Sequence, residues 1–225
     1  MNDTQPEHST LMKAGISGTL FLALMLGSVS FAAQENPPPS STESTTTEPA
    51  IAPYLREDAP SFSLTIAQFR EKFATANPTL PLGEYKTIKT LEVKSPLLRA
   101  ASRINSTLYS SVAIDKSQRT IKSLQLTYLP PIPSEEKTEK PEEITKTEKA
   151  NKAVLINYMS AFINLFEPTL SAEKCQKKSI ELLEKGKGAS FYQQTEGTLR
   201  FVIADHREKG ITFAIEPIKL SLSDK

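Results

Sequence analysis

The chain has 225 residues, and its 27 basic and 26 acidic side chains leave a net charge of +1. Such a balance provides no strongly basic surface for a polyanion, so nucleic-acid binding is not expected. Tryptophan is absent and aromatic residues make up 7% of the chain, which argues against a platform for stacking bases or sugars. The one cysteine, Cys175, cannot form an intramolecular disulfide, and we expect it to be a buried helix residue.

The N-terminal segment is typical of a secretory signal peptide. Lys13 precedes the apolar run Leu20–Leu26, and small residues lead to a cleavage site after Ala32. The run is short for a membrane span, which needs about 20 mostly apolar residues, and no cysteine follows it to carry a lipid. We therefore predict a cleaved signal over residues 1–32, with Met12 as an alternative start, and no stable membrane anchor.

Composition divides the remainder into a spacer and one folded region. Residues 33–53 are rich in Pro, Ser and Thr and cannot bury enough apolar surface to offset their ordering entropy, so we predict a disordered spacer. Residues 54–225 are predicted to form a single α+β domain. Within it, 130–150 carries prolines and alternating charges, which indicates a solvated linker or a frayed helix entry.

The first half of this domain is predicted to contain two helices and a hairpin. Thr65 and Gln68 form the capping-box pattern before a helix over 66–76. Ser95 and Pro96 have the types expected at a helix start. The predicted order is helix 66–76, a short strand at 85–88, helix 95–108, and a hairpin of strands 109–114 and 120–129.

The second half is predicted to repeat this pattern with one more strand. Apolar residues at helical spacing indicate a helix from about Thr145 that Pro168 ends, and another from Ser171 to Gly186. A three-stranded meander follows, over 189–195, 198–205 and 210–216. The predicted fold is therefore α+β with four helices and antiparallel strands in the order ααββ-ααβββ, which suggests two similar halves.

The residues that could perform chemistry are few. His206 falls in a predicted turn beside charged residues, where a surface role is expected rather than general-base catalysis. Gly186 to Gly188 come before a predicted strand, whereas a phosphate-binding loop comes before a helix. We therefore interpret them as the C-cap of the preceding helix. Glu196 and Glu216 are the carboxylates that a cleft could pair, although a solvated turn is the expected place for them. We predict no catalytic residue, no cofactor site and no metal site.

Three arginines are the candidate contacts for an anion or a partner. Arg99 and Arg103 are four residues apart on the predicted helix 95–108, so they are expected to share a face. Arg200 lies on a predicted strand, on the face opposite Leu199 and Phe201. The alternative for all three is a solvated or salt-bridged surface.

Several short strings give the chain a resemblance to a known family. They lie between residues 54 and 220 and include Gln68-Phe-Arg70, Arg99-Ala-Ala-Ser102, Thr195-Glu-Gly197 and Glu216-Pro-Ile-Lys-Leu220. On these strings the chain resembles the YiiQ-like family of exported enterobacterial proteins of unknown function. The resemblance implies a periplasmic location in a Gram-negative cell, and it carries over no activity and no site residue.

Three functional hypotheses follow. The first is a non-catalytic periplasmic protein that binds an envelope protein or component through one face of its sheet or its interhelical groove. The second is a small-ligand carrier with an apolar pocket between helices and sheet, of at least about 300 Å³. The third is a hydrolase that uses carboxylates or a serine, which requires Glu196, Glu216 or a serine to converge in a cleft.

Overall fold

The fold is taken from a computed structural model, which describes residues 43–46, 52–56, 58–89, 97–131, 141–207 and 210–219. The predicted signal peptide and most of the predicted spacer lie outside the described residues. Two short parts of that spacer are described: Glu43–Thr45 forms a strand, and Pro53 begins a 3₁₀ helix.

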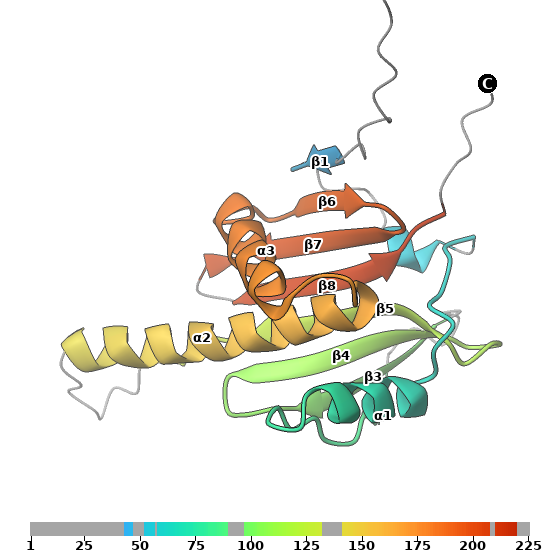
Figure 1. The fold of residues 1–225 in the computed structure, drawn as a ribbon, viewed down its shortest axis with the longest axis horizontal. Helices are drawn as coiled ribbons and strands as arrows, with labels where there is room; N and C mark the ends of the chain where they lie inside the picture. Colours follow the sequence, from blue (N-terminus) through green and yellow to red (C-terminus); the bar gives the residue numbers. More distant parts are fainter. Residues whose placement is uncertain are drawn as a thin grey trace, which may run out of the picture. The chain divides into compact units, whose positions relative to one another are not determined.

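The described residues form one antiparallel sheet of eight strands (Figure 1), in the order β1-β6-β7-β8-β5-β4-β3-β2. β5 and β8 pair at its centre and join two meanders. The strands are β1 (Glu43–Thr45), β2 (Lys86–Ile88), β3 (Leu97–Arg103), β4 (Leu108–Asp115), β5 (Ile121–Tyr128), β6 (Tyr192–Glu196), β7 (Leu199–Asp205) and β8 (Ile211–Pro217).

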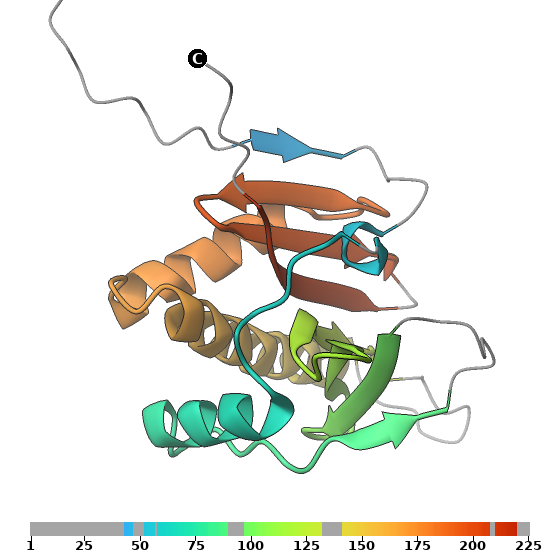
Figure 2. The same ribbon diagram turned by 90° about the vertical axis from the view of Figure 1, so that its right-hand side faces the viewer.

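Three α-helices cover one face of this sheet, as the two views in Figures 1 and 2 show. They are α1 (Ile66–Ala76), α2 (Pro141–Phe166) and α3 (Ala172–Lys185). The core lies between helices and sheet, because alternate strand residues point to that side. It is built from fully buried residues of α2 and the central strands, among them Leu155, Met159, Phe162, Leu124, Leu126, Phe201 and Phe213.

The helix α1 begins as the sequence predicts. The Thr65 side chain accepts from the backbone N–H of Gln68, and the Gln68 side chain accepts from the N–H of Thr65, so the capping box is complete. Phe69 and Phe73 are fully buried and both lie edge-on to Phe162, with ring centroids 5.5 and 5.4 Å away. These aromatic contacts attach α1 to α2.

The predicted helix over 95–108 is wrong. Residues Leu97–Arg103 form the strand β3, which pairs with β2 on one side and β4 on the other. Its leucines, alanines and arginines favour a helix in isolation, but the sheet satisfies their backbone groups on both sides and overrides that weak preference. The residue types at Ser95 and Pro96 misled the prediction, and both lie outside the described residues.

The predicted order ααββ-ααβββ is wrong for the same reason. The described part of the chain holds three α-helices instead of four, and the first half has one α-helix followed by β2 to β5. The ααββ repeat that suggested two similar halves is therefore absent. The mixed α+β class agrees with the structure, and the hairpin β4–β5 and the meander β6–β8 are confirmed.

The last part of the charged segment 130–150 is the start of a helix, which is one of the two alternatives expected for it. The helix begins at Pro141 rather than near Thr145, and residues 132–140 lie outside the described residues. At its other end Glu167 follows the helix directly and Pro168 comes next, as expected for a stop signal. No helix in the described ranges is both long enough and apolar enough to cross a membrane.

Among the described residues, no α-helix lies on the second face of the sheet. The 3₁₀ helix η1 (Pro53–Leu55) crosses it, and the chain then passes to the helix side toward α1 (Figure 2). On the way, the backbone of Phe62 and Leu64 bonds to Ile121 at the start of β5. We call this second face the outer face.

Candidate binding site

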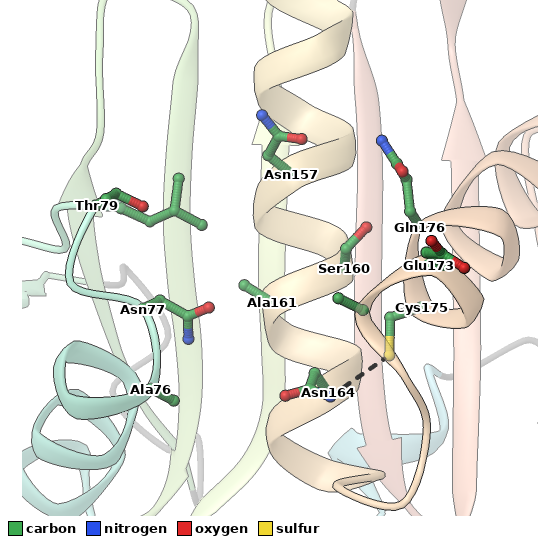
Figure 3. A pocket seen from close by; sticks show the side chains of 12 residues that line it. Ala76, Asn77, Thr79, Asn157, Ser160, Ala161, Asn164, Glu173, Cys175 and Gln176 are labelled. Carbon is green, nitrogen blue, oxygen red and sulfur yellow. Dashed lines mark hydrogen bonds between the residues drawn. The ribbon is translucent and has the colours of Figure 1, made fainter.

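A groove lies between the three helices and is lined by the core helix α2. Its volume is about 470 Å³ and it is open to solvent on one side. Figure 3 shows α2 along its middle, the end of α1 and the following loop on one side, and α3 on the other. The side chains that define it carry amide and hydroxyl groups: Asn77, Thr79, Asn157, Ser160, Asn164 and Gln176.

Three of the polar side chains form a row along the middle of the groove because of the helical periodicity of α2. Asn157, Ser160 and Asn164 are three and four residues apart on α2, so they share one face of the helix. The fully buried Met159 and Phe162 point the other way, into the core. One stretch of α2 therefore fills the core and lines the groove at the same time.

Some of the groove's polar groups already have protein partners. The Asn164 amide donates to the backbone oxygen of Leu170 at 2.9 Å, and the Asn77 amide donates to that of Phe73 at 3.2 Å. Ser160 Oγ donates to the Ile156 carbonyl at 2.7 Å and lies 3.1 Å from Ser179 Oγ. These bonds hold the walls of the groove in place.

Other polar groups remain available for a ligand. Within the described part of the chain, the side chains of Asn157, Gln176 and Thr79 make no hydrogen bond, and all three are exposed. Because a side-chain amide carries two donors and one acceptor, Asn157 and Gln176 present the richest set of unused polar groups in the groove.

Cys175 lies at the α3 wall and is fully buried, as the sequence predicts. Asn164 Nδ2 approaches its sulfur at 3.8 Å (Figure 3). Burial is the main cause that raises the pKa of this thiol, so it stays protonated at neutral pH and is a poor nucleophile. The cysteine is a packing residue of the groove.

The groove differs from the pocket expected of an apolar-ligand carrier. That hypothesis required an apolar cavity enclosed between helices and sheet, whereas this groove is open and amides and hydroxyls make up half of its lining residues. Its chemistry suits a polar, uncharged ligand that can both donate and accept hydrogen bonds.

The three candidate arginines all lie on the outer face, away from the groove. Arg99 and Arg103 share this face although β3 is not a helix, because a separation of four residues is also a multiple of the strand period of two. The cross-strand pairs Arg99–Ala113, Ala113–Ser123 and Arg200–Glu216 place Arg99 and Arg200 in one row across the sheet.

Distance keeps these arginines from forming one site. Four strand spacings separate Arg99 from Arg200, which is about 19 Å, and Arg103 lies about 13 Å along β3 from Arg99. Arg99 donates to the Tyr54 hydroxyl at 3.0 Å with its guanidinium 5.6 Å from that ring. Arg103 lies 5.9 Å from the Tyr109 ring. Each arginine therefore has its own local partner.

Arg200 is bound in a buried polar network. Its guanidinium contacts Glu216 at 2.6 Å, and Ser123 Oγ donates to the other carboxylate oxygen at 3.3 Å. Glu216 is 2% exposed. Burial raises the pKa of Glu216, while Arg200 and Ser123 oppose that rise. The network stabilises the centre of the outer face and leaves Arg200 engaged.

The carboxylate pair that a hydrolase would need does not form. Glu196 lies on the helix side, where its Oε2 is 2.6 Å from Lys178 Nζ of α3, and Glu216 lies on the outer face with Arg200. The sheet separates the two side chains, because their positions in the ladder point to opposite faces. His206 is exposed in the turn after β7, and no metal-binding cluster occurs among the described residues.

Sequence reasoning missed the residues that line the groove. Asn77, Asn157 and Gln176 come from three elements that are far apart in the chain, and only the packing of the helices brings them together. The one signal in the sequence was polar residues at the spacing 157, 160 and 164 within an otherwise apolar helix.

The fold defines an α+β protein with an open polar groove between its helices, and no catalytic centre is recognisable among the described residues. The chain belongs to the family described as "Protein of unknown function (DUF1454)", whose model matches residues 22–224. It is 46% identical over 173 residues to the uncharacterized protein YiiQ of Escherichia coli (strain K12), covering 77% of this chain and 81% of that protein. No solved structure matches the chain.

Proposed function

We propose that the protein is a non-catalytic binding module of the periplasm, and that its interhelical groove binds an extended polypeptide segment of an envelope partner. The observation that carries this proposal is the set of unused amides in the groove. A side-chain amide can accept from the N–H and donate to the C=O of one residue in an extended chain, because these two groups point to the same side. Neutral groups of this kind recognise a backbone, whatever its side chains.

The spacing along α2 fits an extended chain. Asn157 and Asn164 are seven residues apart, which is about 10.5 Å along the helix axis. Three residues of an extended strand cover about the same length. A polypeptide that lies along the groove can therefore meet Asn157 and the free oxygen of Asn164 with backbone groups about three residues apart, while Gln176 reaches it from α3.

The composition of the groove also disfavours other neutral polar ligands. No aromatic side chain lines it, and sugars are commonly held against aromatic faces. Glu173 is the charged residue among the lining side chains, so the groove has no cation for an acidic ligand. A neutral, hydrogen-bonding polypeptide is the class that remains.

Site-specific photo-crosslinking in a Gram-negative host tests the proposal. A photoreactive phenylalanine is placed at Asn157 or Gln176, and the control position is Lys174, which lies on α3 outside the groove lining. We expect the same discrete crosslinked polypeptide from both groove positions and none from Lys174. With the probe at Gln176, the substitution Asn157→Ala should reduce the yield at least fivefold.

Equal crosslinking from all three positions, or none from the groove positions, would contradict the groove proposal.

The location is tested separately by cell fractionation. Export predicts a shortened chain in the periplasmic fraction that begins after Ala32, and a variant without residues 1–32 should stay in the cytoplasm. A full-length chain that remains with the membrane fraction would contradict cleavage.

A further inference from the structure

A second cavity lies at the end of the sheet and shares no lining residue with the groove. Its volume is about 430 Å³, and it is formed by the end of β5, the first half of α2, the loop after α3 and the turn after β7. Three cations from three of these elements line it: Lys152 of α2, Lys187 of the loop and Arg207 of the turn. We call it the cationic cleft.

The described lining of the cleft holds more cations than carboxylates. Among the described residues, none of Lys152, Lys187 and Arg207 forms an ion pair, and all three are exposed. Two carboxylates also line the cleft, Glu148 and Asp205. Asp205 is occupied, because its two oxygens accept from the backbone N–H groups of Gly188 and Arg207 at 2.8 and 2.9 Å. These neutral donors leave the charge of Asp205 in place, so the three cations outnumber the carboxylates that line the cleft by one.

The Asp205 bonds fix the loops that carry two of the cations. Gly188 and Arg207 both have left-handed backbone conformations, with φ of +68° and +56°. Such a conformation is uncommon for arginine and persists where the surroundings impose it. Asp205 bonds to the backbone of both residues. The loop that carries Lys187 and the turn that carries Arg207 are therefore held beside one another before any ligand binds.

A buried tyrosine hydroxyl lies in the same cleft. Tyr128 of β5 is 3% exposed and lines the cavity. Its hydroxyl makes no hydrogen bond of normal geometry with the described residues, although the Asn151 side chain lies close enough to lower its pKa and the charge of Glu148 raises it. Burial is the main cause that raises the pKa of Tyr128, so the hydroxyl keeps its proton and can donate. A buried donor without an acceptor is costly, and an anion would supply the acceptor.

We propose that the cationic cleft binds a phosphate-type oxyanion carried by a small molecule or a lipid headgroup. Lys152, Lys187 and Arg207 neutralise the anion, and the Tyr128 hydroxyl donates to one of its oxygens. The excess of cations over carboxylates in the cleft favours an anion, and arginine pairs with phosphate through two parallel bonds. The cavity is large enough to hold the group that carries the phosphate.

Nuclear magnetic resonance titration of the exported chain with inorganic phosphate tests this site. The control is sodium chloride at the same ionic strength, because screening alone changes shifts of charged surfaces. We expect saturable shifts of the Gly188 and Arg207 amides with phosphate and with glycerol phosphate, and none with chloride. Vesicles containing phosphatidylglycerol form a second arm, and binding to them alone would assign the phosphate to a lipid.

Substitutions identify the groups that bind. Lys187→Gln and Arg207→Gln should each weaken phosphate binding at least fivefold, whereas Lys174→Gln, an exposed lysine of α3, should leave it unchanged. Tyr128→Phe removes one oxygen from a buried position, so it should weaken binding about fivefold without lowering the melting temperature.

Two results would overturn the proposal. One is the absence of saturable shifts with phosphate, glycerol phosphate and vesicles alike. The other is unchanged affinity in both Lys187→Gln and Arg207→Gln. Because the cleft and the groove have no residue in common, these results leave the peptide-binding proposal unaffected, and the crosslinking result leaves this one unaffected.

Discussion

Arg200 and Glu216 face each other on neighbouring strands, and both guanidinium contacts go to the same carboxylate oxygen, Oε2, at 3.0 Å from Nε and 2.6 Å from Nη2. The Glu216 side chain is 3% exposed and the Arg200 side chain 15% exposed. A charge pair this deeply buried is costly to break from one side, since the remaining charge has neither water nor a partner.

Removing only the cation of this pair should destabilise the fold. We expect Arg200→Met to lower the free energy of unfolding by about 3 kcal/mol, and the double variant Arg200→Met with Glu216→Leu to recover much of that loss. Urea denaturation at pH 7 measures both. In the single variant the loss of unfolding free energy should become smaller as the pH falls, because protonation of Glu216 removes its unpaired charge. Equal losses in the single and double variants would contradict the prediction.

Asp115 should contribute to stability in a way that acid removes. It ends β4, and its carboxylate accepts from Ser117 Oγ at 2.6 Å and from the backbone N–H of Gln118 at 2.8 Å. These bonds lower its pKa from the ordinary 3.8. The unfolded chain thus takes up this proton first, and the stabilisation, complete above about pH 3.8, is lost as the pH falls toward the lowered pKa.

The pH dependence of unfolding measures this contribution. Asp115→Asn keeps an acceptor but cannot titrate, so its stability should fall less steeply than that of the wild type below about pH 3.8. Asp58→Asn, at an exposed surface carboxylate, is the control and should show the wild-type slope. An unchanged slope in Asp115→Asn would show that the turn bonds are not coupled to folding.

Gly210 should tolerate no side chain. Its φ is +104°, and a Cβ placed there would lie 2.2 Å from the backbone oxygen of Tyr128. Gly210→Ala should therefore cost at least about 2 kcal/mol. Gly197→Ala is the matched control, because its φ is also positive but no atom lies within 4 Å of the added carbon, and it should cost about 1 kcal/mol. Thermal unfolding distinguishes the two variants.

Phe162 should be the most sensitive aromatic residue of the helix layer. It is fully buried and its ring meets those of Phe69 and Phe73. Phe162→Ala should cost about 4 kcal/mol, because it leaves a cavity where α1 and α2 meet. Ile180 is 43% exposed, so Ile180→Ala should cost less than about 1 kcal/mol. Similar losses in both would contradict this account of the core.

Cys175 should be unreactive while the protein is folded. Its side chain is fully buried and burial raises the pKa of the thiol. A thiol reagent should label the native protein at a rate set by unfolding, and label the urea-unfolded chain at once. Rapid labelling of the native protein would show that the α3 wall of the groove opens.

Local patterns in the chain were sufficient for several elements. The capping box at Thr65 and Gln68 places the start of α1, and the alternation of Leu199, Phe201 and Ile203 identifies β7. These signals depend only on neighbours within a few residues, so they can be recognised without the tertiary structure. The helix predicted over 95–108 failed because Leu97–Arg103 contains good helix formers, and only β2 and β4 on either side make it a strand.

The sequence by itself determined the type of most elements, the expectation of an exported chain, the buried single cysteine and the common face of Arg99 and Arg103. Tertiary structure alone decided which distant residues meet. It placed Glu196 and Glu216 on opposite faces of the sheet, and it gathered Asn157 with Gln176 and Tyr128 with Arg207. Periodicity fixes the face on which a side chain lies, whereas strand order and helix packing fix what lies opposite it.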